Sequence, residues 1–182
     1  MGKPMLMVHI CCAPDGLYVM DLLKDEYDAV GFFYNPNIFP IEEYDRRLQD
    51  AEKVGRLRGF PVVRGPRDHE MWLAMTQKFK DEPEMGRRCD ICYAMRLNRT
   101  ARTAAGRGFD FFTTVMSLSP WKKAESLNRI GAVLGRKHGL TFIEADFKKK
   151  DGFRKSVEMS KSIDLYRQDY CGCPYSQSLH AL

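Results

Sequence analysis

The sequence has little of what would place the chain in a membrane or outside the cell. Although 44% of its 182 residues are hydrophobic, no apolar run approaches the roughly 20 residues that a bilayer-spanning helix needs. The first ten residues carry one lysine and a short apolar run, without the long apolar region and cleavage site of a secretory signal. We therefore expect a cytoplasmic protein with no membrane partner.

Internal repeats, low-complexity segments and flexible linkers are also lacking. A chain of 182 residues can bury a substantial core as one domain, so it needs no disulfide or metal merely to fold. We expect one domain over residues 1–182. The net charge of +5 is mildly basic, which permits an anionic partner without requiring one.

Five β-rich runs alternate with segments of helical periodicity. Residues 42–59 and 122–139 repeat apolar side chains at helical spacing, and both segments end in glycine, as helices often do. This alternation predicts parallel βαβ units and a doubly wound α/β fold with helices on both faces of the sheet. The candidate strands are Met5–Ile10, Ala29–Tyr34, Pro61–Val63, Phe109–Val115 and Leu140–Ala145.

The six cysteines fall into three close pairs, and the first pair lies in HICCAPDG, residues 9–16. Cytosolic thiols stay reduced, so this grouping indicates metal or redox chemistry rather than a disulfide framework. The motif follows the first candidate strand, at the edge where open α/β sheets bind ligands. Pro14 suits the start of a helix whose N–H groups would stabilise thiolates. Alternatively, Cys11 and Cys12 are small buried hydrophobic residues.

The second pair, Cys89 and Cys92, is spaced so that both side chains can point the same way from a loop or a first helical turn. Alone, this pair would equally suit a redox dithiol or half of a zinc site. With the first pair it offers four thiolates, which fit zinc or an iron–sulfur cluster. Iron is favoured because adjacent cysteines chelate one tetrahedral ion awkwardly, whereas a cluster offers them separate iron atoms.

The third pair, Cys171 and Cys173, flanks a glycine near the end of a tail that we expect to fold back onto the domain after a helix. A redox pair with a strained, reducible disulfide, further metal ligands and a structural clasp are all compatible with this spacing. Among the other polar residues, His9 is expected to form hydrogen bonds at a strand end. Asp15 would serve as a helix cap.

Basic residues recur around the second cysteine pair and after the fourth and fifth candidate strands. In the predicted topology several of them gather on one rim, where they would bind the phosphates of an RNA backbone. Aromatic residues nearby could stack on a splayed base, although each one alone is more typical of a core. The basic residues are Arg87, Arg88, Arg96, Arg99, Lys122, Lys123 and residues 148–150, and the aromatic ones are Tyr34, Phe39, Trp121 and Tyr170.

Over almost its whole length the chain resembles the cobalamin-independent epoxyqueuosine reductases, the QueH family. The resemblance implies a HUP-like, Rossmann-like fold and an oxidoreductase of tRNA modification. Such an enzyme removes the epoxide oxygen of epoxyqueuosine at the wobble position of a GUN anticodon, using an external electron donor. The motifs are HICCAPDG, YNPNIFPIEEYDRR, GRRCDICYAMRLNRTA, FTTVMSLSPWKKAESLNRIG and FKKKDGFRKSVEMSKSIDLYRQDYCGCPYS.

The same resemblance implies roles for individual residues. Asp15 stands where many family members carry a further cysteine, and its harder oxygen would hold a second iron or donate a proton. Cys171 and Cys173 match a redox motif of the family, which makes them candidate catalytic residues, and a disulfide bond is among the expected features. The implied ligands of a [4Fe-4S] cluster are Cys11, Cys12, Cys89 and Cys92.

Two other functions compete with this one. An iron–sulfur-dependent tRNA-thiolating enzyme that uses ATP would need a Gly/Ser-rich phosphate loop after the first strand, and CCAPDG lacks such a loop. A non-catalytic zinc protein that binds RNA would use the same thiols. The colour of the anaerobically purified protein separates these readings, since a cluster is brown and zinc is colourless.

Overall fold

The computed structural model describes residues 2–177 and contains a five-stranded sheet in the order β3-β2-β1-β4-β5. Every neighbouring pair of strands runs parallel, so each connection crosses over a face of the sheet. This topology confirms the predicted doubly wound α/β fold. The strands are β1 Met5–His9, β2 Asp28–Phe33, β3 Val62–Arg64, β4 Phe111–Thr114 and β5 Thr141–Phe142.

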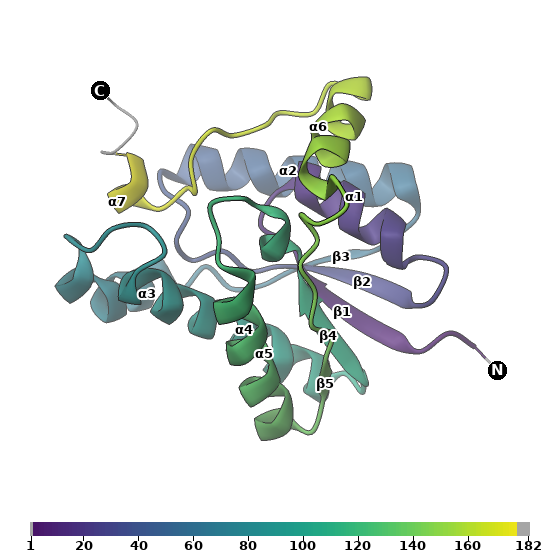
Figure 1. Ribbon diagram of the computed structural model, residues 1–182, viewed down its shortest axis with the longest axis horizontal. Helices are drawn as coiled ribbons and strands as arrows, with labels where there is room; N and C mark the ends of the chain where they lie inside the picture. The colour runs from purple at the N-terminus through teal and green to yellow at the C-terminus, as the bar shows by residue number, and fades with distance from the viewer. Residues whose placement is uncertain (1, 178–182) are drawn as a thin grey trace.

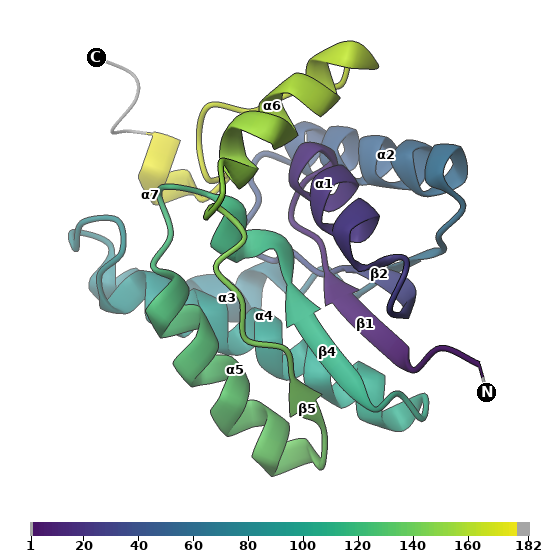
Figure 2. The same ribbon diagram turned by 45° about the vertical axis from the view of Figure 1, so that its right-hand side comes forward.

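Helices cover both faces of the sheet (Figures 1 and 2). On one face α1 packs against α2 and α6, and on the other α4 packs against α5 and α3. Among the described residues, no helix combines the length and the apolar character needed to cross a bilayer. The helices are α1 Ala13–Leu23, α2 Ile41–Arg58, α3 His69–Thr76, η1 Gln77–Phe79, α4 Arg87–Gly106, η2 Val115–Leu118, α5 Ala124–His138, α6 Gly152–Ser162 and α7 Pro174–Gln177.

Local sequence signals explain where several elements begin and end. Leu6, Met7 and Val8 are completely buried because the central strand β1 is covered on both faces. Gly59 and Gly139 follow α2 and α5 with φ values of 74° and 70°. This left-handed conformation is easily adopted by glycine, so both predicted helix ends are confirmed.

The fifth strand is shorter than the sequence pattern predicts. Only Thr141–Phe142 pairs with β4, because β5 lies at the edge of the sheet and the chain then leaves it. Beyond the strand, the Ala145 N–H donates to the side-chain oxygen of Asn128 instead of a neighbouring strand. Edge strands are often short, and β5 has a neighbouring strand on one side only, which does not support a longer strand.

The C-terminal segment, residues 163–177, folds back toward the loops that follow β1, β2 and β4 (Figure 1). The Phe39 N–H donates to the Gly172 carbonyl at 2.8 Å. The guanidinium of Arg47 donates to the carbonyls of Tyr170 and Cys171, each at 3.2 Å. The predicted return of the cysteine-bearing tail onto the domain is therefore confirmed.

Candidate functional site

Cys11, Cys12 and Asp15 meet in the turn that leads from β1 into α1. All three are buried, and their sulfur and carboxylate atoms lie within 4.8 Å of one another. Pro14 lies in the first turn, as the sequence predicts, and Cys12 is the extended N-cap residue. Asp15 lies in the first turn and is not the N-cap residue, so the prediction that it caps the helix is wrong. Its carboxylate instead joins the two thiols as a third possible ligand for a metal.

Hydrogen bonding and burial set the protonation states of this group. The hydrogen bond from Cys12 lowers the pKa of the Cys11 thiol to about 5, and the charges of nearby cations act in the same direction. Cys12, as the donor, has its pKa raised well above the ordinary value. Burial raises the pKa of Asp15 to about 6, and the Cys11 charge adds to this rise. Cys11 is therefore a thiolate at neutral pH.

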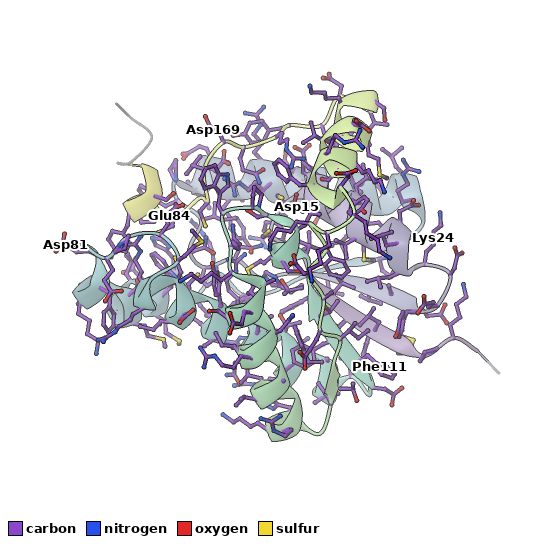
Figure 3. All side chains as sticks on the ribbon, in the orientation of Figure 1. Asp15, Lys24, Asp81, Glu84, Phe111 and Asp169 are labelled. Atoms are coloured by element: carbon purple, nitrogen blue, oxygen red, sulfur yellow. The ribbon has the colours of Figure 1, made fainter. Side chains whose placement is uncertain are left out.

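A cavity of about 330 Å³ opens beside this turn, and one cysteine from each pair lines it. Cys11, Cys89 and Cys171 reach the wall together with Asp15. Figure 3 shows Asp15 in the interior of the molecule, away from Lys24 and Phe111, which lie toward the opposite end of the sheet. The site thus lies at the carboxyl edge of the strands, where open α/β sheets bind ligands.

Cys89 and Cys92 lie at the beginning of α4, which confirms their predicted place in a first helical turn. The Met85 N–H donates to Cys89 Sγ at 3.3 Å, and burial raises the pKa of Cys89 to about 11. Cys92 is buried next to Trp72 and Cys173. Within the described residues, neither Cys89 nor Cys92 belongs to the group of ligand atoms around Asp15. The four cysteines predicted as ligands therefore suit a cluster of several metal atoms better than a single metal ion.

Cys171 and Cys173 are free thiols in the structure, so the expected disulfide bond is not formed. Cys173 packs in the cluster with Trp72 and Cys92, and Cys171 packs against the same cluster and also lines the cavity. Burial raises the pKa of Cys173 to about 12.

Two arginines of the predicted phosphate-binding rim are buried, and that part of the prediction is wrong. Arg96 is only 1% exposed; it donates to Asn35 Oδ1 at 2.6 Å and lies 3.9 Å from Cys92 Sγ. Arg88 is 2% exposed and donates to backbone carbonyls of the loop before α4. Arg96 thus places a positive charge beside the thiols, where it would balance an anionic group.

His9 forms the strand-end hydrogen bonds that the sequence predicts. Its Nδ1 lies 2.9 Å from Thr114 Oγ1, and its Nε2 lies 3.0 Å from the Tyr34 carbonyl, which can only accept. Burial, followed by the charge of Arg96, keeps the pKa of His9 well below its ordinary value. The neutral imidazole joins the ends of β1, β2 and β4 beneath the site.

Two further arginines of the site were not predicted from the sequence. Arg167 Nη2 lies 3.6 Å from Asp15 Oδ1, and Arg47 holds the backbone of the Cys171 segment. A signal for Arg47 was present, because it lies three residues after Tyr44 and four before Ala51 on the apolar stripe of α2. A charged residue on such a stripe needs a buried partner, and Glu43 Oε1 lies 2.6 Å from Arg47 Nε.

The candidate base-stacking aromatics occupy very different environments. Tyr34 is 1% exposed and its hydroxyl donates to Asp68, so it is a core residue. Phe39 is partly exposed but stacks on His69. Tyr170 lines the cavity with the Arg47 guanidinium 5.2 Å from its ring centre. Trp121 also lines the cavity and is 64% exposed.

Two solved structures share the fold at low sequence identity. A predicted subunit of tRNA methyltransferase from Methanocaldococcus jannaschii matches 85% of this chain and 76% of its own, with a TM-score of 0.57 and 14% identity. The second is the U34-tRNA thiolase NcsA from Methanococcus maripaludis, solved with its [4Fe-4S] cluster. The match covers 96% of this chain and 62% of the thiolase, with a TM-score of 0.54 and 12% identity. These similarities confirm the Rossmann-like α/β architecture.

Sequence relatives are much more similar. The epoxyqueuosine reductase QueH of Streptococcus pyogenes serotype M1 is 33% identical over 186 residues, which cover 99% of this chain and 73% of the relative. The epoxyqueuosine reductase QueH of Thermotoga maritima is 36% identical over 174 residues, which cover 94% of this chain and 89% of the relative. The model of the family described as epoxyqueuosine reductase QueH matches residues 6–179. The chain therefore belongs to the QueH family of epoxyqueuosine reductases.

Proposed function

We propose that this chain reduces epoxyqueuosine to queuosine at the wobble position of tRNAs with a GUN anticodon, without cobalamin, as one cytoplasmic domain over residues 1–182. One observation carries the proposal: Cys11, Cys89 and Cys171 bring one thiol of each cysteine pair to the same cavity as Asp15. Membership of the QueH family supports this reaction. The cavity gives the substrate access to thiols and a carboxyl group together.

The reaction needs two electrons and two protons. Both carbon–oxygen bonds of the epoxide break, an alkene forms, and the oxygen leaves as water. A [4Fe-4S] cluster held by Cys11, Cys12, Cys89 and Cys92 would supply the electrons one at a time from an external donor. The site must therefore hold a redox group, admit the epoxide and deliver protons to its oxygen.

The residues present fit such a group. Thiolates are soft ligands that bind iron–sulfur clusters, and Cys11 is already deprotonated at neutral pH because its pKa is about 5. Arg96, which approaches Cys92 Sγ at 3.9 Å, would offset the negative charge of a thiolate-bound cluster. Asp15, within 4.8 Å of Cys11 and Cys12, would hold the second iron through a hard oxygen ligand.

The remaining roles fall to Asp15 and the tail cysteines. A carboxyl group with a pKa of about 6 can exchange a proton near neutral pH, so an unliganded Asp15 would supply one to the leaving oxygen. Cys171 lines the cavity, and its oxidation with Cys173 to a disulfide would release two electrons and two protons. The external donor would then restore both thiols.

Access to the cavity favours a nucleotide that is turned out of its stack. A wobble base in a single-stranded anticodon loop can be presented in this way at lower cost than a paired base. Positive side chains would bind the RNA backbone, and binding should weaken steeply with added salt. The residues of the predicted rim that remain exposed are Arg87, Lys123, Lys149 and Lys150.

Anaerobic turnover tests the proposal. The reconstituted protein is incubated with epoxyqueuosine-bearing tRNA and a chemical reductant, without cobalamin or ATP, and the digested nucleosides are identified by mass spectrometry. We expect queuosine to appear, and an intact cluster that yields none would contradict the assignment. A requirement for ATP would instead favour thiolation. Asp15→Asn should slow turnover, whereas Asp21→Asn, a control on the exposed side of the same helix, should not.

A further inference from the structure

Trp121 presents an unusual amount of apolar surface at the cavity. The indole is 64% exposed, although it lines the same wall as Cys11 and Asp15. The other aromatic residues on this wall are less available: Tyr93 is 3% exposed, and arginines lie over the rings of Phe153 and Tyr170. Large exposed aromatic side chains beside a cavity are typical of ligand contacts.

The turn that carries Trp121 is held firmly. It follows η2, whose four residues are all buried, and the Thr114 hydroxyl accepts from the N–H of Met116 at 3.2 Å. Ser119 closes the turn, since its carbonyl accepts from the Lys122 N–H and its hydroxyl accepts from the backbone N–H of Trp121 at 3.3 Å. A backbone held in this way limits the conformational entropy that the turn loses when a ligand stacks on the indole.

Lys122, the next residue, occupies the inside of the same cavity. Its side chain is partly buried, lines the wall, and interacts electrostatically with Cys171, Cys11 and Asp15. Lys123 differs, because it is exposed, does not line the cavity and forms the N-cap position of α5. One turn therefore offers a flat apolar surface at the exposed side of the cavity and an ammonium group within it.

A ligand that uses both groups must combine a flat ring with an oxygen acceptor. We propose that Trp121 and Lys122 form a substrate-recognition pair, an inference that rests on the proposed function. The indole stacks on the modified wobble base, and the ammonium donates a hydrogen bond to the epoxide oxygen. The pair sets the depth to which the nucleotide enters. It thereby brings the oxygen to the side of the cavity lined by Asp15 and Cys11.

Binding of three anticodon stem–loop RNAs to the holoenzyme tests the stacking contact. The RNAs carry epoxyqueuosine, queuosine or an abasic nucleotide at the wobble position, and no reductant is added. Trp121→Ala should weaken binding of the epoxyqueuosine RNA by about tenfold or more, the usual effect of losing one stacked base. Binding of the abasic RNA should stay unchanged, and Trp121→Phe should restore most of the affinity. Equal weakening for both RNAs, or none for either, would overturn the stacking role.

The same RNAs test Lys122. The wild-type holoenzyme should bind the epoxyqueuosine RNA about tenfold more tightly than the queuosine RNA, because a hydrogen bond from a charged donor is lost with the oxygen. Lys122→Met should abolish this preference, whereas the neighbouring control Lys123→Met should keep it, because a contact of Lys123 with the RNA backbone would be the same in both RNAs. Equal wild-type affinities, or the same loss in both variants, would overturn the role of Lys122.

These binding measurements do not depend on turnover. If the expected binding effects of Trp121 and Lys122 are found but no epoxyqueuosine is converted when reductant is supplied, the proposed function is refuted and the recognition pair stands. If the protein turns over and neither binding effect is found, the pair is refuted and the function stands. The two proposals can therefore fail separately.

Discussion

Arg167 of the C-terminal segment forms an ion pair with Asp15 in the first turn of α1, with 3.6 Å between Nη2 and Oδ1. Arg167 also donates to the Ser156 hydroxyl on α6 at 3.2 Å. The tail is thus tied to the turn that contains Cys11, Cys12 and Asp15, to α6, and through Arg47 to α2. The carboxyl group that we assign to the second iron is held in place by the same segment that carries Cys171 and Cys173.

Arg167→Gln should raise the pKa of Asp15 above about 6 in the metal-free protein. Burial and the Cys11 charge already raise this pKa, and the positive charge of Arg167 opposes them, so its removal favours the protonated acid. The carboxyl carbon signal of Asp15 in NMR would report the midpoint. Arg154→Gln, which changes an exposed arginine on α6, should leave it unchanged. An unaltered midpoint in Arg167→Gln would contradict the pairing.

Cys11 should react with iodoacetamide at a nearly constant rate between pH 6 and 8 in the metal-free protein. Its pKa is about 5, so the thiolate fraction is already close to its maximum at pH 6. Cys89, whose pKa is about 11, should instead react about tenfold faster for each pH unit. Peptide mass spectrometry would follow both sites. A tenfold rise per unit at Cys11 would show that Cys12 does not stabilise its thiolate.

His9 should make the metal-free protein less stable as the pH falls below 6.5. The unfolded chain binds a proton at this histidine near pH 6.5, whereas the folded protein, with its lowered His9 pKa, does not. Protons therefore favour the unfolded state, and this histidine lowers the free energy of unfolding as the pH falls from 7 to 5. His9→Gln should lose less stability over the same range in urea titrations. Identical pH dependence would mean that His9 is protonated in the fold.

Arg47→Met should destabilise the protein by about 3 to 5 kcal/mol, because it leaves the buried carboxylate of Glu43 without its cation. It also removes the hydrogen bonds to the carbonyls of Tyr170 and Cys171. Urea unfolding would measure the loss, and faster labelling of Cys171 would report release of the tail. Arg56→Met, on the exposed face of the same helix, should change stability by less than about 0.5 kcal/mol. Similar losses of stability in both variants would argue against the role of Arg47 in holding the tail on the domain.

Much of the framework follows from local sequence patterns. The strand runs and the helix-ending glycines gave the order of the elements, and parallel topology then placed the loop containing Cys11 and Asp15 at the ligand-binding edge. The helical spacing of Cys89 and Cys92 likewise put both at the start of α4. These features depend on short-range periodicity and on the general rules of α/β sheets.

Features that depend on tertiary packing could not be predicted in the same way. Arg96 and Arg88 look like surface cations in the sequence, yet α4 turns them inward, where they meet buried acceptors. The ion pair of Arg167 with Asp15 joins residues far apart in the sequence, and no local sequence pattern predicts it. The free thiols of Cys171 and Cys173 are likewise a property of the folded tail, because a Cys-Gly-Cys spacing alone is compatible with a disulfide or with two free thiols.

Iron and acid-labile sulfide in anaerobically purified variants test the central claim most directly. Replacing any one of Cys11, Cys12, Cys89 or Cys92 with serine should remove the brown colour and most of the sulfide. The Cys171→Ser and Cys173→Ser variants should keep the cluster and lose turnover. A colourless wild-type protein loaded with zinc, or full sulfide content after loss of Cys11 and Cys89 together, would contradict the account.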